Sequence, residues 1–412
     1  KRQFLVQMFN ETDIQVMKRI WHSIDPHELS NRGKMFPEVT ATPPEQPAIE
    51  ESTEPVSRNG LRPTTVEEVQ EAIRTQKQLH ARAGGSKTAL STAPEGVTCL
   101  DLSGLSGVLE YDPTEFTFIA RAGTPVREIQ DLLAKHGQFL PFDPVLVDSG
   151  ATLGGTVAAG TSGPGRFRHG GVRDFLLGVR FVTGVGELVQ GGAKVVKNAA
   201  GFDLPKLLVG SLGRLGVFVD VAFKVFPQPE SYATLQLETS KLEAALEHIY
   251  ELNTSSFDVE ALDLEPPGKI LLRIGGRTAA ISSRLERIRS TLGGGDILQG
   301  KEEESLWHST REFGWAPADS SLVKVPLTIA MIPRIEECLN ATGVRRRYSV
   351  GGNLAWIAWP LPLEGLESTL STLHLSGLVL RGSEKRVHLG RSKGEKLAQL
   401  VKRALDPQDR FP

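Results

Sequence analysis

Near both ends of the chain, hydrophobic residues recur with the spacing of one helix face. A helix that Asn10 or Thr12 caps and Pro26 stops is predicted first, because proline lacks the N–H that a helix needs. Its apolar positions are Ile14, Met17, Ile20, Trp21 and Ile24. A second helix is predicted over 394–407, with apolar positions Leu397, Leu400, Val401, Ala404 and Leu405. An Asp-Pro pair and later a Phe-Pro pair follow each helix, which is either a repeated ending or a chance similarity.

Between residues 61 and 230, most stretches alternate with the period of two that is typical of strands. Helices are predicted after Thr64 or Thr65 and over 124–137, the second ending at Gly137. Strands are predicted at 80–82, 97–102, 107–112, 116–123 and 217–226.

The pattern changes at residue 231 to strands that precede helices. Strands are predicted at 232–238, 269–274, 321–327 and 353–360, and helices at 241–252 and 278–292. The chain is therefore predicted to be α+β, with a first domain over 61–230 and a smaller α+β cap domain over 231–412. Residues 40–60 are rich in Pro, Thr, Glu and Ser, which predicts a flexible linker after a separate segment at 1–39.

Composition narrows the function classes. The net charge of −2 gives no broad attraction to nucleic acid or anionic membrane. No run of eighteen apolar residues predicts a membrane span, so a cytoplasmic location is expected, with membrane contact only through a partner. The two cysteines, Cys99 and Cys338, are far apart and predict neither a disulfide framework nor a metal site.

Glycine is concentrated in one region, since 17 of the 42 glycines lie within 150–216. Two glycine loops stand out, at 82–87 (RAGGSK) and at 150–160 (GATLGGTVAAG). Backbone N–H groups in the first loop can form a nest for a pyrophosphate, with Gly84 and Gly85 leaving room for it. The small residues of the second loop let backbone approach a large planar ligand. A phosphate-binding P-loop and a GxGxxG motif are both missing from the sequence, which argues against a classical dinucleotide fold.

The two loops together resemble the flavin loops of PCMH-type FAD-binding domains of the vanillyl-alcohol-oxidase superfamily. The following stretches at 171–188 and 210–229 resemble the later strands of that family. Residues 197–204 (KNAAGFDL) are similar to a stretch found in the FAD-binding subunit of glycolate oxidases. Residues 1–39, with SNRGK at 30–34, resemble the C-terminal end of a second glycolate oxidase chain, a related FAD-linked oxidase. The sequence is therefore expected to be a piece of a longer fusion.

The resemblance implies FAD as cofactor and a 2-hydroxy acid as substrate. A histidine follows the glycine pair in the covalent branch of the superfamily, and Ser86 stands at that place, so noncovalent FAD is expected. The residues expected to bind FAD are Arg82, Ala83, Gly84, Gly85, Ser86, Lys87, Thr152, Gly154, Gly155, Thr156, Gly160 and Val217.

Catalytic candidates lie in the basic stretch at 163–170. Arg166 is interpreted as a carboxylate-binding residue and His169 as the general base. Alternatively, the arginines of this stretch contact phosphate or another chain of a complex. The cap histidines His308, His374 and His388 follow no metal-binding spacing, and no metal is expected.

Three functions remain open at this point. The first is the FAD-binding subunit of a glycolate oxidase complex, whose partners are the related FAD-linked oxidase chain and an iron–sulfur protein. The second is an assembly or electron-relay role, in which this chain keeps the fold while the FAD-linked oxidase partner does the chemistry. The third is a different PCMH-type enzyme, which the 197–204 stretch argues against.

Overall fold

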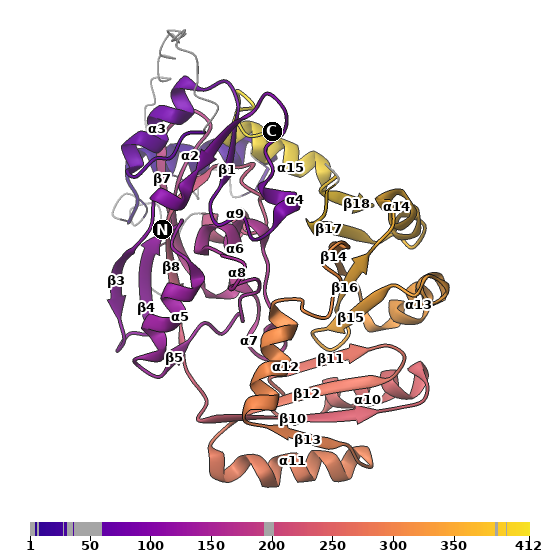
Figure 1. Ribbon diagram of the computed structural model, residues 1–412. Coiled ribbons are helices and arrows are strands. Elements are labelled where there is room, and N and C mark those ends of the chain that lie inside the picture. The colour runs from indigo at the N-terminus through magenta and orange to yellow at the C-terminus, as the bar shows by residue number, and fades with distance from the viewer. Residues whose placement is uncertain are drawn as a thin grey trace.

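The computed structural model describes residues 5, 8–27, 29–30, 36, 60–192, 202–383, 386–392 and 394–412. The predicted linker before Gly60, most of the stretch at 30–34 and residues 197–201 lie outside them. The fold is α+β, as predicted, with a first domain of two subdomains and a second domain on one large sheet (Figure 1).

The smaller subdomain pairs two parallel strands beside one helix. Thr65 begins this helix through a capping box, in which its hydroxyl accepts from the Glu68 N–H and the Glu68 carboxylate accepts from the Thr65 N–H. The buried face of the helix packs against Leu100 in the second strand. The elements are α3 (Val66–Thr75), β1 (Leu79–Arg82), α4 (Thr88–Ser91), β2 (Thr98–Asp101) and the 3₁₀ turn η1 (Leu102–Gly104).

The larger subdomain is an antiparallel sheet in the order β3-β4-β8-β6-β7. Its central strand β8 (Val217–Lys224) is buried at its first seven positions, as a strand covered on both faces must be. The other strands are β3 (Val108–Asp112), β4 (Thr117–Arg121), β6 (Leu176–Val182) and β7 (Leu188–Gly192), with the separate pair β5 (Gln138–Phe139) and β9 (Phe226–Pro227). The helices are α5 (Val126–Ala134), α6 (Leu153–Ala159), α7 (Arg166–His169), α8 (Val172–Phe175) and α9 (Leu204–Leu208).

The cap is an antiparallel sheet of nine strands. Helices cover one of its faces, while α12 and the first domain cover the other (Figure 1). In sheet order the strands are β13 (Asp296–Gln299), β10 (Ser231–Glu238), β12 (Lys269–Gly276), β11 (Ala261–Glu265), β15 (Arg345–Ser349), β16 (Leu354–Trp359), β14 (Ser321–Pro326), β17 (Ser376–Arg381) and β18 (His388–Gly390). The helices are α10 (Leu242–Thr254), α11 (Thr278–Leu292), α12 (Lys301–Arg311), α13 (Ile332–Leu339) and α14 (Leu363–Thr372), with 3₁₀ turns η2 (Ile329–Met331) and η3 (Asn340–Thr342).

The predicted helices at the two ends, α2 (Glu11–Ile24) and α15 (Glu395–Leu405), lie side by side on the first domain (Figure 1). The domain boundary at 230 assigns 394–412 to the cap, but this segment returns to the first domain. The Gly184 N–H donates to the Leu405 carbonyl oxygen (2.9 Å), and the Leu79 N–H donates to the Arg410 carbonyl oxygen (2.7 Å).

The repeated ending in the sequence is also repeated in three dimensions. Asp25 and Asp406 each follow their helix with nearly the same backbone angles, φ −128° and ψ 70° against φ −139° and ψ 72°. The carboxylate of Asp25 accepts from the N–H groups of Leu29 and Ser30. The carboxylate of Asp406 accepts from those of Arg410 and Phe411, at the same offsets of four and five residues.

Candidate functional site

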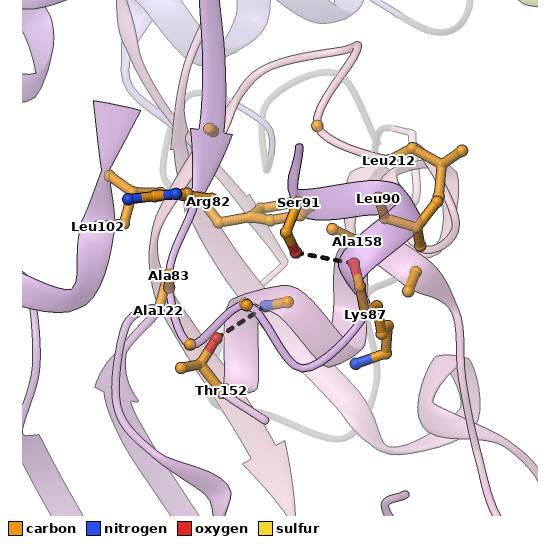
Figure 2. Close-up of a pocket in the computed structure, with 18 of the residues that line it drawn as sticks. Arg82, Ala83, Lys87, Leu90, Ser91, Leu102, Ala122, Thr152, Ala158 and Leu212 are labelled. Carbon is orange, nitrogen blue, oxygen red and sulfur yellow. Dashed lines mark hydrogen bonds between the residues drawn. The ribbon is translucent and has the colours of Figure 1, made fainter. Parts of the chain in front are cut away.

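A pocket opens in the first domain between the turn after β1, helix α6 and the beginning of β8 (Figure 2). Small and apolar side chains make up most of its wall, and Arg82 and Lys87 bring positive charge to it from the glycine turn. Such a wall suits an elongated ligand that is partly aromatic and partly anionic.

The turn at 82–87 is shaped by two glycines with different roles. Gly85 has φ +69° and faces open space, so it supplies a left-handed backbone. A Cβ on Gly84 would lie 1.7 Å from the carbonyl oxygen of Gly150, so Gly84 allows the two glycine loops to touch. Within the described residues, the N–H groups of Gly84, Gly85 and Ser86 donate to no protein acceptor, which leaves them for an anion.

The second glycine segment was predicted to be a loop, and this was wrong, because most of it forms helix α6. Thr152 begins the helix by accepting the Gly155 N–H on its hydroxyl (3.3 Å). Glycine is needed inside this helix for packing, since a Cβ on Gly154 would lie 2.8 Å from the Cβ of Ala122. Gly160 then ends the helix with φ +57°.

Most residues expected to bind the cofactor line this one pocket: Arg82, Ala83, Gly84, Gly85, Ser86, Lys87, Thr152, Gly154, Gly155 and Val217. Thr156 does not line it, because its side chain is buried and its hydroxyl donates to the Thr152 carbonyl oxygen (2.9 Å). Gly160 lies in a neighbouring cleft instead. Sequence reasoning missed the lining residues Leu90, Ser91, Leu102, Ala122, Ala158, Leu212, Gly213, Gly216 and Phe218. The glycine-rich region that holds Gly213 and Gly216 was noticed, but nothing in the sequence marks which of its residues face a ligand.

The neighbouring cleft meets the pocket at Ala159, which lines both. It runs between the first domain and the cap strands β14, β17 and β18. Arg166 comes from the first domain, and Lys324, His374 and His388 come from the cap. Among the predicted candidates, the structure thus brings Arg166 close to the pocket.

Two lysines near this junction are largely surrounded by protein. Burial lowers the pKa of Lys87 to about 8, and the Glu312 carboxylate acts in the opposite direction. Burial also lowers the pKa of Lys324 to about 8, and the positive charges of Arg166 and Lys87 lower it further. Lys324 keeps partial access to the cleft, and its Nζ donates to the Gly160 carbonyl oxygen (2.7 Å).

His169 is separated from Arg166, although both lie on α7. Its Nε2 is 2.8 Å from a Glu260 carboxylate oxygen of the cap, and the rings of Phe139 and Phe226 contact it edge-on. It lines another cavity, together with Tyr232 and Arg273. The structure therefore places His169 in a contact between the domains and not in the cleft with Arg166.

In the described part of the chain, no group of three or more His, Cys, Asp or Glu residues could hold a metal ion. Both cysteines are free thiols. None of the described helices is long and apolar enough to cross a membrane.

Comparison with known proteins identifies the family to which this chain belongs. The FAD binding domain family matches residues 60–192, which include both glycine segments. The glycolate oxidase subunit GlcE of Escherichia coli (strain K12) is 34% identical over 265 residues, which are 63% of this chain and 75% of that protein. The chain belongs to the GlcE family. It is an FAD-dependent oxidoreductase, and the predicted resemblance and cofactor are confirmed.

Other relatives of this GlcE-family chain share less with it. The D-2-hydroxyglutarate dehydrogenase of Xanthomonas citri pv. viticola is 24% identical and is matched over 67% of this chain and 59% of that protein. The glycolate oxidase subunit GlcD of Bacillus subtilis (strain 168) is 28% identical, over 42% of this chain and 36% of that protein. A solved alkyldihydroxyacetonephosphate synthase has the same fold, with a TM-score of 0.62 at 15% identity over 85% of this chain and 74% of that one.

The residues of the GlcE-family pocket fit FAD. In the part of the chain that the structure describes, the N–H groups of Gly84 to Ser86 have no protein acceptor, and together with the ammonium of Lys87 they suit a pyrophosphate. The apolar wall around Leu102, Ala122 and Phe218 suits aromatic rings.

Proposed function

We propose that this chain is the FAD-binding subunit of a glycolate oxidase complex, in which a 2-hydroxy acid is oxidised to a keto acid. Bound FAD supplies the hydride acceptor for the Cα hydrogen of the substrate. The observation that carries the proposal is the cationic cleft that opens from the flavin pocket at Ala159. A small anionic substrate in this cleft would lie next to the cofactor.

The protein residues then have three tasks: to hold FAD, to hold the substrate carboxylate and to accept the hydroxyl proton. The turn at 82–87 holds FAD noncovalently, since Ser86 cannot form the histidyl link. Arg166 binds the carboxylate. His388 lines the cleft, where partial desolvation and the charge of Arg214 lower its pKa, so the ring is neutral and able to accept a proton at pH 7.

The test is the visible spectrum of the purified chain with glycolate, without oxygen. Bleaching of the flavin bands by glycolate is the expected result. Flavin bands that persist with both glycolate and D-lactate would contradict the catalytic role of this chain.

The second candidate is an assembly or electron-relay role. The observation in its favour is that His169, the first candidate base, is paired with Glu260. In either role we propose a GlcD-like flavoprotein and an iron–sulfur protein as partners, which co-purification from a host that expresses all three chains would test.

A further inference from the structure

Lys324 lies on the face of the cap sheet that packs against the first domain, and its neighbours on the two adjacent strands are apolar. Along β14, Val323 and Val325 point into the core under the cap helices, while Leu322 and Lys324 point to the other side. The cross-strand neighbours of Lys324 are Trp356 and Leu378, which belong to the apolar cluster that this face forms with the first domain. A partly buried ammonium among apolar side chains lowers the stability of the fold, so its charge is expected to serve a purpose at this position.

The charged groups that act most strongly on Lys324 have the same sign as its own charge. The two groups that act on it electrostatically are Arg166 and Lys87, and both are cations. Among the described residues, neither Lys324 nor Arg166 has a carboxylate within ion-pair distance. Asp174 also lines the cleft, but its carboxylate accepts the Gly171 N–H (2.8 Å).

We propose that Lys324, together with Arg166, forms the subsite that holds the carboxylate of the hydroxy acid beside the flavin. The inference rests on the proposed function and adds the cap residue that completes it. An arginine presents a planar pair of donors to a carboxylate, and a lysine adds a point charge from another direction. The subsite is assembled from both domains, so neither domain alone can bind the substrate.

The position of Lys324 relative to the cofactor supports this assignment. Its Nζ reaches the carbonyl oxygen of Gly160, the residue that ends the flavin-pocket helix α6. A carboxylate bound by this ammonium would therefore lie at the end of the flavin pocket, one residue beyond the shared wall at Ala159.

The experiment is a titration of the FAD-loaded chain with oxalate, an analogue of glycolate that has no Cα hydrogen, followed by the flavin spectrum and by calorimetry. Lys324→Met keeps the length and the apolar stem of the side chain and removes the charge. We expect the Kd for oxalate to rise at least about tenfold in Lys324→Met and to recover in Lys324→Arg, while FAD content stays at the wild-type level. The control Lys269→Met removes a lysine from β12 outside the cleft and should leave the Kd unchanged.

An unchanged Kd for oxalate in Lys324→Met would overturn the proposal. Sulfite adds to the flavin ring. A variant that binds oxalate normally but loses affinity for sulfite would also overturn the proposal, because the charge of Lys324 would then act on the flavin and not on the substrate. A wild-type chain that binds oxalate through Lys324 but is not reduced by glycolate would contradict the proposed function and leave the subsite intact. If glycolate reduces the flavin but oxalate does not bind, the subsite is wrong and the function stands.

Discussion

Gly84 and Gly150 touch backbone to backbone. A Cβ on Gly84 would lie 1.7 Å from the Gly150 carbonyl oxygen and 2.9 Å from the carbonyl carbon, and Gly150 itself has φ +87°. The turn at 82–87 and the segment that leads into α6 are therefore held in place by each other, because no side chain separates them.

Gly84→Ala is expected to destabilise the chain by about 3 kcal/mol, since the methyl group would collide with backbone that cannot rotate away. Thermal unfolding of the FAD-free chain is the measurement. A Gly84→Ala variant with wild-type stability would show that the two loops can move apart without cost.

Gly85→Ala separates the effect on the ligand from the effect on the fold. Gly85 (φ +69°) and Gly96 (φ +81°) both have a left-handed backbone and open space around a Cβ, but only Gly85 lines the pocket. Each alanine should cost about 1–2 kcal/mol of stability. Only Gly85→Ala should weaken FAD binding in equilibrium dialysis, and equal FAD affinities in the two variants would contradict the assignment of the nest.

The affinity for FAD should depend on pH through Lys87. Its pKa is about 8 before FAD binds, and a bound pyrophosphate would return it toward the usual value near 10.5. Binding then takes up a proton above pH 8, so the affinity should fall as the pH rises from about 8 to about 9.5, by at most about tenfold per unit, and stay level below pH 8. Lys87→Met should bind more weakly at pH 7 and lose this dependence, and parallel pH profiles for the two proteins would exclude Lys87 as its source.

His169 and Glu260 are expected to stabilise the contact between the domains without taking part in chemistry. Each of His169→Gln and Glu260→Gln should lower the free energy of unfolding by about 1–2 kcal/mol, and the double variant by less than the sum. Flavin reduction by glycolate should slow far more in His388→Gln than in either variant. A large rate loss in His169→Gln alone would restore His169 as the base.

Asp25 and Asp406, the aspartates that follow α2 and α15, make the same backbone hydrogen bonds but differ in burial, so their alanine variants can be compared directly. Asp406 is buried, and its carboxylate also pairs with Lys402, whereas Asp25 is only half-buried. Asp406→Ala should lower the free energy of unfolding by about 3 kcal/mol, because two backbone N–H groups lose their acceptor in a buried place. Asp25→Ala should have only a small effect in the same denaturant titration, and equal losses would show that burial does not distinguish the two sites.

Periodicity predicted the end helices and most of the strands, because each of these segments buries one clear face. It failed for helix α6, since glycine and alanine carry no amphipathic pattern and the N-cap Thr152 resembles an ordinary loop residue. The turn at 82–87 was recognised from local glycine chemistry. Lys324 could not be recognised, because a lysine that alternates with valines in a strand predicts a solvent-facing position. Only the packing of the cap on the first domain places it at the cleft.

The return of residues 394–412 to the first domain has a consequence for how the protein is made. This segment supplies the Arg410 carbonyl that strand β1 uses and the Leu405 carbonyl that Gly184 uses. During synthesis, the flavin-binding half emerges from the ribosome first, yet it cannot be completed until the whole cap has been translated. The cap is thus an insertion between the two parts of the first domain, and a ribosome that stops anywhere within it would release a flavin-binding half without its closing segment.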